Sequence, residues 1–229
     1  MFYFGWWDLI PIPGFLLALY AQFKLRGLYA KYHDVPQSRG LTGAEVAQAI
    51  LDRAGIANVA IEPCAGELTD HYDPKNRVLR LSEPNFRSSS LSAIGVAAHE
   101  AGHAIQHKER YAPLEMRMSI VGATQLATSA GMILFLVGLF LHSGLMLQIG
   151  IWCYSAIVIF QLITLPVEYD ASRRAKLVLA EIGLVNRDEG EAIRKVLGAA
   201  ALTYVAGLAT ALLELIRMIA LANAARSRN

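Results

Sequence analysis

The sequence predicts a multi-pass α-helical membrane protein that carries a small α+β domain outside the bilayer. Of its 229 residues, 55% are hydrophobic and only 17% are charged, whereas an average soluble domain carries about 25% charged residues. The mean hydropathy is +0.38. The hydrophobic residues gather in four long blocks instead of being spread with a core-forming period. The blocks indicate membrane spans, and the polar stretches between them indicate surface domains.

The first three blocks predict an anchor and a helical hairpin. Residues 1–23 form the anchor, with aromatic residues placed as a membrane-interface belt. Residues 119–141 and 145–167 each exceed the roughly 20 residues that cross a hydrocarbon core, and neither contains an acidic or basic residue. Only three residues separate them, so we expect a transmembrane hairpin over 119–167 whose two outer ends return to one membrane face.

The fourth block begins at Gly198 and lies in the C-terminal segment, residues 198–229. It contains Glu214 and Arg217, which are spaced i, i+3 on a helix and can neutralise one another. The sequence leaves open whether this fourth apolar helix spans the membrane fully.

Lysine and arginine are distributed unevenly between the polar segments. Residues 24–118 carry 12 of them and residues 168–197 carry 6, while none precedes the first block. By the positive-inside rule, both segments are expected in the cytoplasm. No run of five or more like charges occurs, which argues against a nucleic-acid partner.

Two helices are predicted within the cytoplasmic domain, residues 24–118. Thr42 and Glu45 form a capping box before a helix that runs to about Ala54. The alanine-rich stretch Leu91–His107 reads as a second helix that begins at a serine.

Two short strands are expected between these helices. Ala57–Glu62 and Arg77–Leu81 are strand candidates, and the turn-rich residues 68–76 separate them. We expect them to form a short β-hairpin before the second helix. A free edge on Arg77–Leu81 would allow an extended substrate to add as a further strand. A purely structural strand fits the sequence equally well.

The second helix contains an HExxH motif. His99 and His103 are spaced i, i+4, so both imidazoles lie on one face of the helix and can share one Zn²⁺. Glu100 then lies beside the position where water binds, as the general base of a metallopeptidase. The motif predicts zinc-assisted hydrolysis of an amide bond.

A catalytic zinc needs a third protein ligand. His107 lies about 12 Å along a straight helix from His99, which is too far to share a metal. Glu168 follows the third block, and the hairpin returns it to the membrane face near which the HExxH helix ends. We therefore expect Glu168 as the third ligand, with Asp170 as the alternative ligand or as a partner that orients a ligand.

His71, within the turn-rich stretch, is a candidate for stabilising the transition state. A histidine there can donate a hydrogen bond to the developing oxyanion. A turn histidine that makes only local contacts fits the sequence equally well.

Several strings resemble the YugP-like family of membrane-bound zinc metallopeptidases: LTDHYDP at 68–74, LRLSEPNF at 79–86, AAHEAGHAIQH at 97–107, PVEYDASRRA at 166–175 and ALTYVAGL at 201–208. The resemblance implies a zincin-like domain with a gluzincin-type site, related to HtpX-like membrane proteases. It implies His99, His103 and Glu168 as zinc ligands and Glu100 as the catalytic residue. HtpX-like proteins carry a carboxylate four residues after the ligand Glu, whereas this chain has Ser172 there.

The sequence therefore predicts a zinc endopeptidase in the bacterial plasma membrane, with one Zn²⁺ and an active site that faces the cytoplasm. Its expected partners are a protein or peptide substrate, itself membrane-associated, and the lipid bilayer. An inactive zinc-binding membrane scaffold or adaptor is the main alternative. A zinc or proton transporter would place ionisable residues in mid-span, and only Glu214 and Arg217 fit that pattern.

Overall fold

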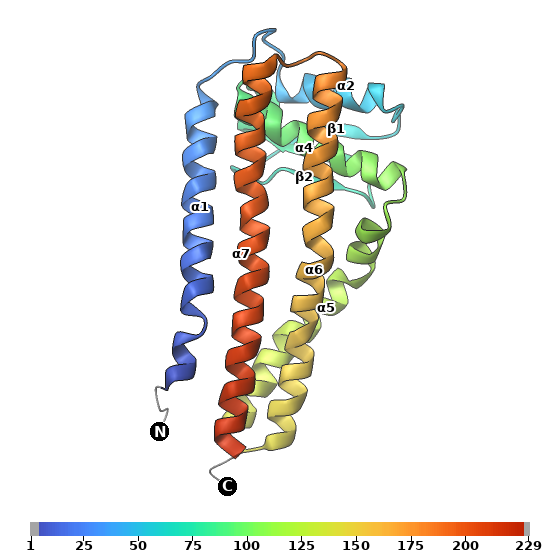
Figure 1. Ribbon diagram of the computed structural model, residues 1–229. Coiled ribbons are helices and arrows are strands. Elements are labelled where there is room, and N and C mark those ends of the chain that lie inside the picture. Colours follow the sequence, from blue (N-terminus) through green and yellow to red (C-terminus); the bar gives the residue numbers. More distant parts are fainter. Residues whose placement is uncertain (1–4, 227–229) are drawn as a thin grey trace. The chain divides into compact units, whose positions relative to one another are not determined.

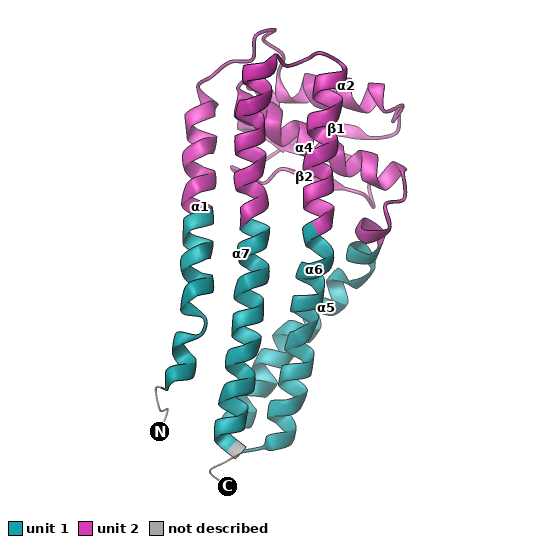
Figure 2. Cartoon of the chain, in the orientation of Figure 1, with its two compact units in different colours: residues 1–21, 116–165, 203–229 teal, residues 22–115, 166–202 magenta. Residues whose placement is uncertain are grey.

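The computed structural model describes residues 5–226 (Figure 1), so residues 1–4 of the predicted anchor and residues 227–229 of the C-terminal segment lie outside the described residues. The elements follow in the order η1 (Trp6–Leu9), α1 (Ile12–His33), α2 (Gly43–Arg53), β1 (Ala60–Cys64), β2 (His71–Asp73), β3 (Val78–Ser82), α3 (Glu83–Arg87), α4 (Leu91–Lys108), α5 (Ala112–Phe140), α6 (Gly144–Glu181) and α7 (Arg187–Arg226). Two compact units divide the chain (Figure 2). Unit 1 comprises residues 1–21, 116–165 and 203–229, and unit 2 comprises residues 22–115 and 166–202.

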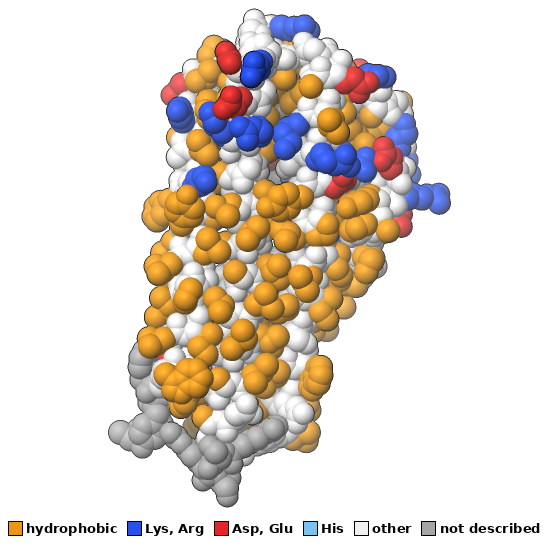
Figure 3. Space-filling model, viewed as in Figure 1, with side chains coloured by type: hydrophobic (Ala, Val, Ile, Leu, Met, Phe, Trp, Pro, Cys, Tyr) orange, Lys and Arg blue, Asp and Glu red, His pale blue; other side chains and the backbone are white. Residues whose placement is uncertain are grey.

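Three helices in the described part of the chain are long and apolar enough to cross a membrane, namely α5, α6 and α7. Their most apolar windows are only 17%, 17% and 33% buried, so most of their hydrophobic side chains face outward. In Figure 3, hydrophobic side chains cover the visible surface of unit 1, whereas charged side chains gather over unit 2. This is the distribution expected when hydrocarbon, and not water, surrounds a bundle of helices.

The predicted anchor over residues 1–23 is not among these three helices. Its described part forms η1 and the first half of α1, and α1 continues ten residues further, to His33. This continuation belongs to unit 2 and carries Lys24, Arg26 and Lys31. The membrane anchor therefore remains a prediction.

Within unit 1, glycines allow α5 and α6 to pack closely. A Cβ atom on Gly131 would lie 3.0 Å from the carbonyl oxygen of Gly150, and one on Gly150 would lie 2.8 Å from that of Gly131. Small residues at such crossings are typical of helices that associate in lipid, where van der Waals packing drives association. Helices α5 and α6 therefore form a closely packed pair, and a transmembrane hairpin over residues 119–167 remains a prediction.

The predicted pairing of Glu214 with Arg217 on α7 is confirmed. A guanidinium nitrogen of Arg217 lies 2.8 Å from the Glu214 carboxylate, and another lies 3.1 Å from Asp8 of η1. Two carboxylates thus surround one guanidinium in unit 1.

Unit 2 contains a three-stranded sheet whose order is β1-β3-β2. A hairpin does precede α4, but β2 and β3 form it, with His71 opposite Arg80. The prediction that Ala57–Glu62 pairs with Arg77–Leu81 as a hairpin was wrong, because β1 and β3 run parallel, with Ala60 opposite Val78. The error has a physical cause: β2 has only three residues and lies within the turn-rich stretch 68–76, where its own strand pattern is too short to see.

The same sheet order corrects the expectation of substrate addition at Arg77–Leu81. Because β3 is the central strand and pairs with both β1 and β2, it has no free edge. Its apolar side chains are instead buried in the core, with Leu79 and Leu81 fully inaccessible.

The helix caps of unit 2 agree with the predictions. Thr42 and Glu45 form the predicted capping box of α2, and the side chain of Ser90 accepts a hydrogen bond from the N–H of Ala93 at the start of α4. Of the 18 residues of α4, most are buried, and α4 packs against α2 and the sheet in one hydrophobic core. This core fixes the helix that carries the HExxH motif.

Candidate metal centre

Helix α4 brings two imidazoles together. His99 and His103 lie one turn apart on one face, and their ring centroids are 4.7 Å apart. Both side chains are largely withdrawn from solvent, with 14% and 11% of their surfaces exposed.

Helix α6 supplies a carboxylate to the same point. Oε2 of Glu168 lies 3.1 Å from Nε2 of His99 and 3.6 Å from Nε2 of His103. The Glu168 side chain is only 2% exposed. The ligand atoms of these three residues all lie within 4.8 Å of one another, so they form a group that could hold a metal ion.

Gly102 explains why α6 can approach α4 so closely. A Cβ atom at this position would lie 2.5 Å from the carbonyl oxygen of Ala171, a separation that real structures essentially never show. Ala171 is less than one turn beyond Glu168 on α6. The glycine inside the HExxH motif therefore sets the helix separation that lets Glu168 reach both histidines.

The outer nitrogen of each imidazole has a polar partner. Nδ1 of His99 lies 3.0 Å from Oγ of Ser172, and Nδ1 of His103 lies 3.0 Å from Oε1 of Gln106. When Nδ1 is protonated it donates to these oxygens and leaves Nε2 unprotonated. That tautomer directs the Nε2 lone pair toward Glu168, as a metal ligand requires.

Asp170 contacts Gln106. The Gln106 amide nitrogen donates to the Val167 carbonyl (2.8 Å) and to Asp170 Oδ2 (3.0 Å), which fixes the direction of its carbonyl oxygen toward His103. Arg173 and Arg174 in turn form ion pairs with Asp170. Asp170 is thus linked to His103 through Gln106 and lies outside the three-residue group.

Glu100 is held at the edge of this group by the sheet. The backbone N–H of Tyr72 on β2 donates to Oε2 of Glu100 (2.9 Å), and Glu100 is itself buried, with 9% of its surface exposed. Only one of the two carboxylate oxygens of Glu100 takes part in this bond.

The charges around His103 favour a cation. Burial disfavours the charged form of His103, but the carboxylates of Glu168 and Glu100 outweigh this effect and raise the pKa of His103 above its usual range. The same negative potential would attract a metal ion. Two imidazoles and one carboxylate are also the donor set of several catalytic zinc sites, so the residues present fit zinc.

Comparison with known proteins agrees with this geometry. A family described as "Putative neutral zinc metallopeptidase" matches residues 7–223. The chain is 47% identical to "Putative membrane protease YugP" of Bacillus subtilis (strain 168) over 210 residues, which cover 92% of this chain and 93% of that protein. The chain belongs to the YugP-like zinc metallopeptidase family. No solved structure matches it.

Two histidines of this family member lie apart from the three-residue group. His71 is exposed on β2, where its ring bonds to the Thr69 carbonyl (2.8 Å) and lies 3.5 Å from an Arg80 nitrogen. His107 lies one turn beyond His103, and its Nδ1 is 2.8 Å from the Tyr72 hydroxyl. The structure gives His71 local contacts, and its part in stabilising a transition state remains a prediction.

Sequence reasoning missed three positioning contacts. Gln106 follows His103 by three residues and Ser172 follows Glu168 by four, so each shares a helix face with a ligand. That periodicity is a usable signal for both. The contact of Tyr72 with Glu100 leaves no such signal in the sequence, because it uses a backbone N–H on a strand that the sequence did not reveal.

Proposed function

We propose that this protein is a membrane-embedded zinc-dependent endopeptidase, with Glu100 as general base and His99, His103 and Glu168 as ligands of one zinc ion. The observation that carries the proposal is the convergence of the three ligand atoms within 4.8 Å beside a buried glutamate. Bound zinc would supply a Lewis acid that acidifies water and polarises a peptide carbonyl.

The chain's own residues then handle the proton and the geometry. Tyr72 holds one oxygen of Glu100, so the other oxygen is oriented to take a proton from the attacking water and to pass it to the leaving amine. Ser172 and Gln106 keep the two imidazoles from rotating. These contacts pre-organise the site before a substrate arrives.

The proposed location is the cytoplasmic surface of the bacterial plasma membrane. Glu168 directly follows the predicted span 145–167 on the continuous helix α6, which supports a site close to the membrane surface. The excess of Lys and Arg in residues 24–118 and 168–197 supports the cytoplasmic side. Membrane proteins, or peptides that reach this surface in extended form, are the proposed substrates.

Proteolysis by detergent-purified protein tests this function. We expect the wild type to cleave a casein-type substrate, a zinc chelator to stop cleavage, and Glu100→Gln to lower the rate by at least about 100-fold. Glu191→Gln, which changes an exposed glutamate on α7, is the matched control and should retain full activity. Zinc-loaded wild type whose activity does not depend on Glu100 would contradict the proposal and favour a scaffold or adaptor.

A further inference from the structure

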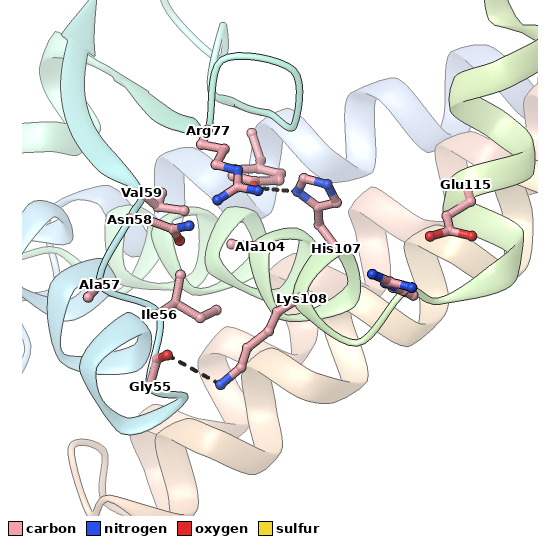
Figure 4. A pocket seen from close by; sticks show the side chains of 12 residues that line it. Gly55, Ile56, Ala57, Asn58, Val59, Arg77, Ala104, His107, Lys108 and Glu115 are labelled. Atoms are coloured by element: carbon pink, nitrogen blue, oxygen red, sulfur yellow. Dashed lines mark hydrogen bonds between the residues drawn. The ribbon is translucent and has the colours of Figure 1, made fainter.

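Unit 2 contains a cavity of about 680 Å³, whose lining residues are shown in Figure 4. Its lining consists of Gly55, Ile56, Ala57, Asn58, Val59, Tyr72, Arg77, Ala104, His107, Lys108, Arg110 and Glu115. Two of these residues connect it to the site: Tyr72 holds Glu100, and Ala104 directly follows the ligand His103. The volume is within the range of pockets that bind small ligands or side chains.

The cavity also lies at a defined distance along α4 from the proposed ligand His103. His107 lines it and is four residues beyond His103, which corresponds to about 6 Å along the helix axis. An extended peptide advances about 3.3 Å per residue. A group bound in the cavity would therefore lie about two residues from a peptide bond held at the metal.

Positive charge dominates the cavity wall. Three cationic side chains line it, Arg77, Lys108 and Arg110, against one carboxylate, Glu115. Lys108 is already engaged, because its ammonium group bonds to the carbonyls of Ala54 and Gly55 at the end of α2.

Arg77 and Arg110 differ from Lys108 in their contacts. Among the residues that the structure describes, neither the Arg77 nor the Arg110 guanidinium forms an ion pair or a side-chain hydrogen bond. Two exposed guanidinium groups that pair with no carboxylate of the described residues thus line one cavity next to the proposed catalytic glutamate.

Both arginines also occupy strained backbone positions. Arg77 has φ = 54° and Arg110 has φ = 53°, in the left-handed region that favours glycine. Arg110 stands just beyond the end of α4, where the Tyr111 N–H bonds back to the Gln106 carbonyl in the arrangement that usually ends with glycine. Arg77 ends the turn of the β2–β3 hairpin, another common glycine position. Glycine at either position would therefore remove the positive charge without adding backbone strain.

We infer that this cavity is a substrate-binding subsite in which Arg77 and Arg110 bind a carboxylate of the peptide that is being cleaved. The inference rests on the proposed peptidase function. Guanidinium groups bind carboxylates in a two-pronged geometry, and a peptide offers a carboxylate either at its C-terminus or on an acidic side chain. A substrate is favoured over a lipid headgroup because Tyr72 forms part of the wall and also holds Glu100, which places the occupant next to the reacting bond.

Equilibrium binding to the zinc-loaded Glu100→Gln protein tests the inference without turnover. The probes are three dansylated hexapeptides of alanine and leucine: one with a free C-terminal carboxylate, its C-terminal amide, and the amide with one leucine replaced by glutamate. At least one carboxylate peptide should bind about tenfold more tightly than the neutral amide. The free-terminus and glutamate peptides show which source of carboxylate the cavity accepts.

Replacing both arginines by glycine should abolish this preference. Arg77→Gly with Arg110→Gly removes both charges while relieving the left-handed strain, so the thermal midpoint of the variant should not fall. Arg87→Ala with Arg194→Ala, which removes two exposed cations outside the cavity, controls for net charge and should keep the preference.

The inference is overturned if no peptide binds, if the neutral amide binds as tightly as both carboxylate peptides, or if the preference survives in the glycine variant. Casein cleavage by the wild type is measured separately. Retained, Glu100-dependent cleavage with no carboxylate preference would leave the proposed function standing and remove only the subsite.

Discussion

At the scale of single residues, the contacts of the two Nδ1 atoms determine how firmly the imidazoles of the candidate site are oriented. Ser172 and Gln106 each hold one Nδ1 at 3.0 Å. The resemblance to HtpX-like proteins implies a carboxylate at the position of Ser172, whereas here a hydroxyl contacts His99. A hydroxyl can accept the same hydrogen bond without adding a negative charge.

Removing this hydroxyl should weaken metal binding without unfolding the protein. We predict that Ser172→Ala lowers zinc affinity about 10- to 100-fold, because His99 loses the partner that fixes its ring, whereas Ser172→Thr keeps the hydroxyl and most of the affinity. Competition with a chromogenic zinc chelator measures the effect. Ser155→Ala on the same helix removes a hydroxyl that bonds only to its own helix backbone, and it should bind zinc as the wild type does. Equal affinities for Ser172→Ala and wild type would contradict this role.

At the scale of elements, the separation of α4 and α6 determines whether Glu168 reaches the histidines. Gly102 faces the Ala171 carbonyl at a distance that leaves no room for a side chain. Gly95 on the same helix has room, because a Cβ atom there would lie 3.4 Å from its nearest neighbour, Cγ2 of Ile193. The two glycines therefore have opposite sensitivities to an added methyl group.

This contrast gives a matched pair of variants. Gly102→Ala should force the helices apart, destabilise the protein by about 1–3 kcal/mol and reduce zinc binding together with it. Gly95→Ala should be neutral or stabilise the protein by up to about 1 kcal/mol, since alanine favours a helix interior over glycine. Thermal unfolding and zinc content of both proteins measure the difference. If both substitutions had the same effect on stability and zinc content, the close approach of α4 and α6 at Gly102 would not determine zinc binding.

Elements also show what the sequence could and could not predict. The HExxH helix and the α2 capping box were predictable because local periodicity and caps determine them. The position of Glu168 beside the two histidines was predictable because a short loop forces the hairpin to return. The strand β2 and the contact of Tyr72 with Glu100 were not, since a three-residue strand takes its structure from its partners and not from its own residues.

At the scale of the whole molecule, three apolar helices and the concentration of Lys and Arg in residues 24–118 and 168–197 predict the orientation in the membrane. Cys64 lies in unit 2 and Cys153 on α6 within the predicted span 145–167, so the two natural thiols report on different segments. Ser143 stands in the short loop that joins α5 to α6.

Thiol labelling of intact bacterial cells tests this orientation. In a Cys153→Ala protein, a membrane-impermeant maleimide should label Cys64 only after the membrane is permeabilised. The control protein carries Ser143→Cys with both natural cysteines replaced by alanine, and it should be labelled in intact cells. Labelling of Cys64 in intact cells would contradict the cytoplasmic placement.

The central claim is that His99, His103 and Glu168 bind one catalytic zinc ion beside Glu100, and the zinc content of purified protein tests it most directly. Elemental analysis should find about one zinc per chain in the wild type and in Glu100→Gln, and little in Glu168→Ala, because a carboxylate ligand is lost only in the last. Full zinc occupancy in Glu168→Ala would contradict the ligand assignment.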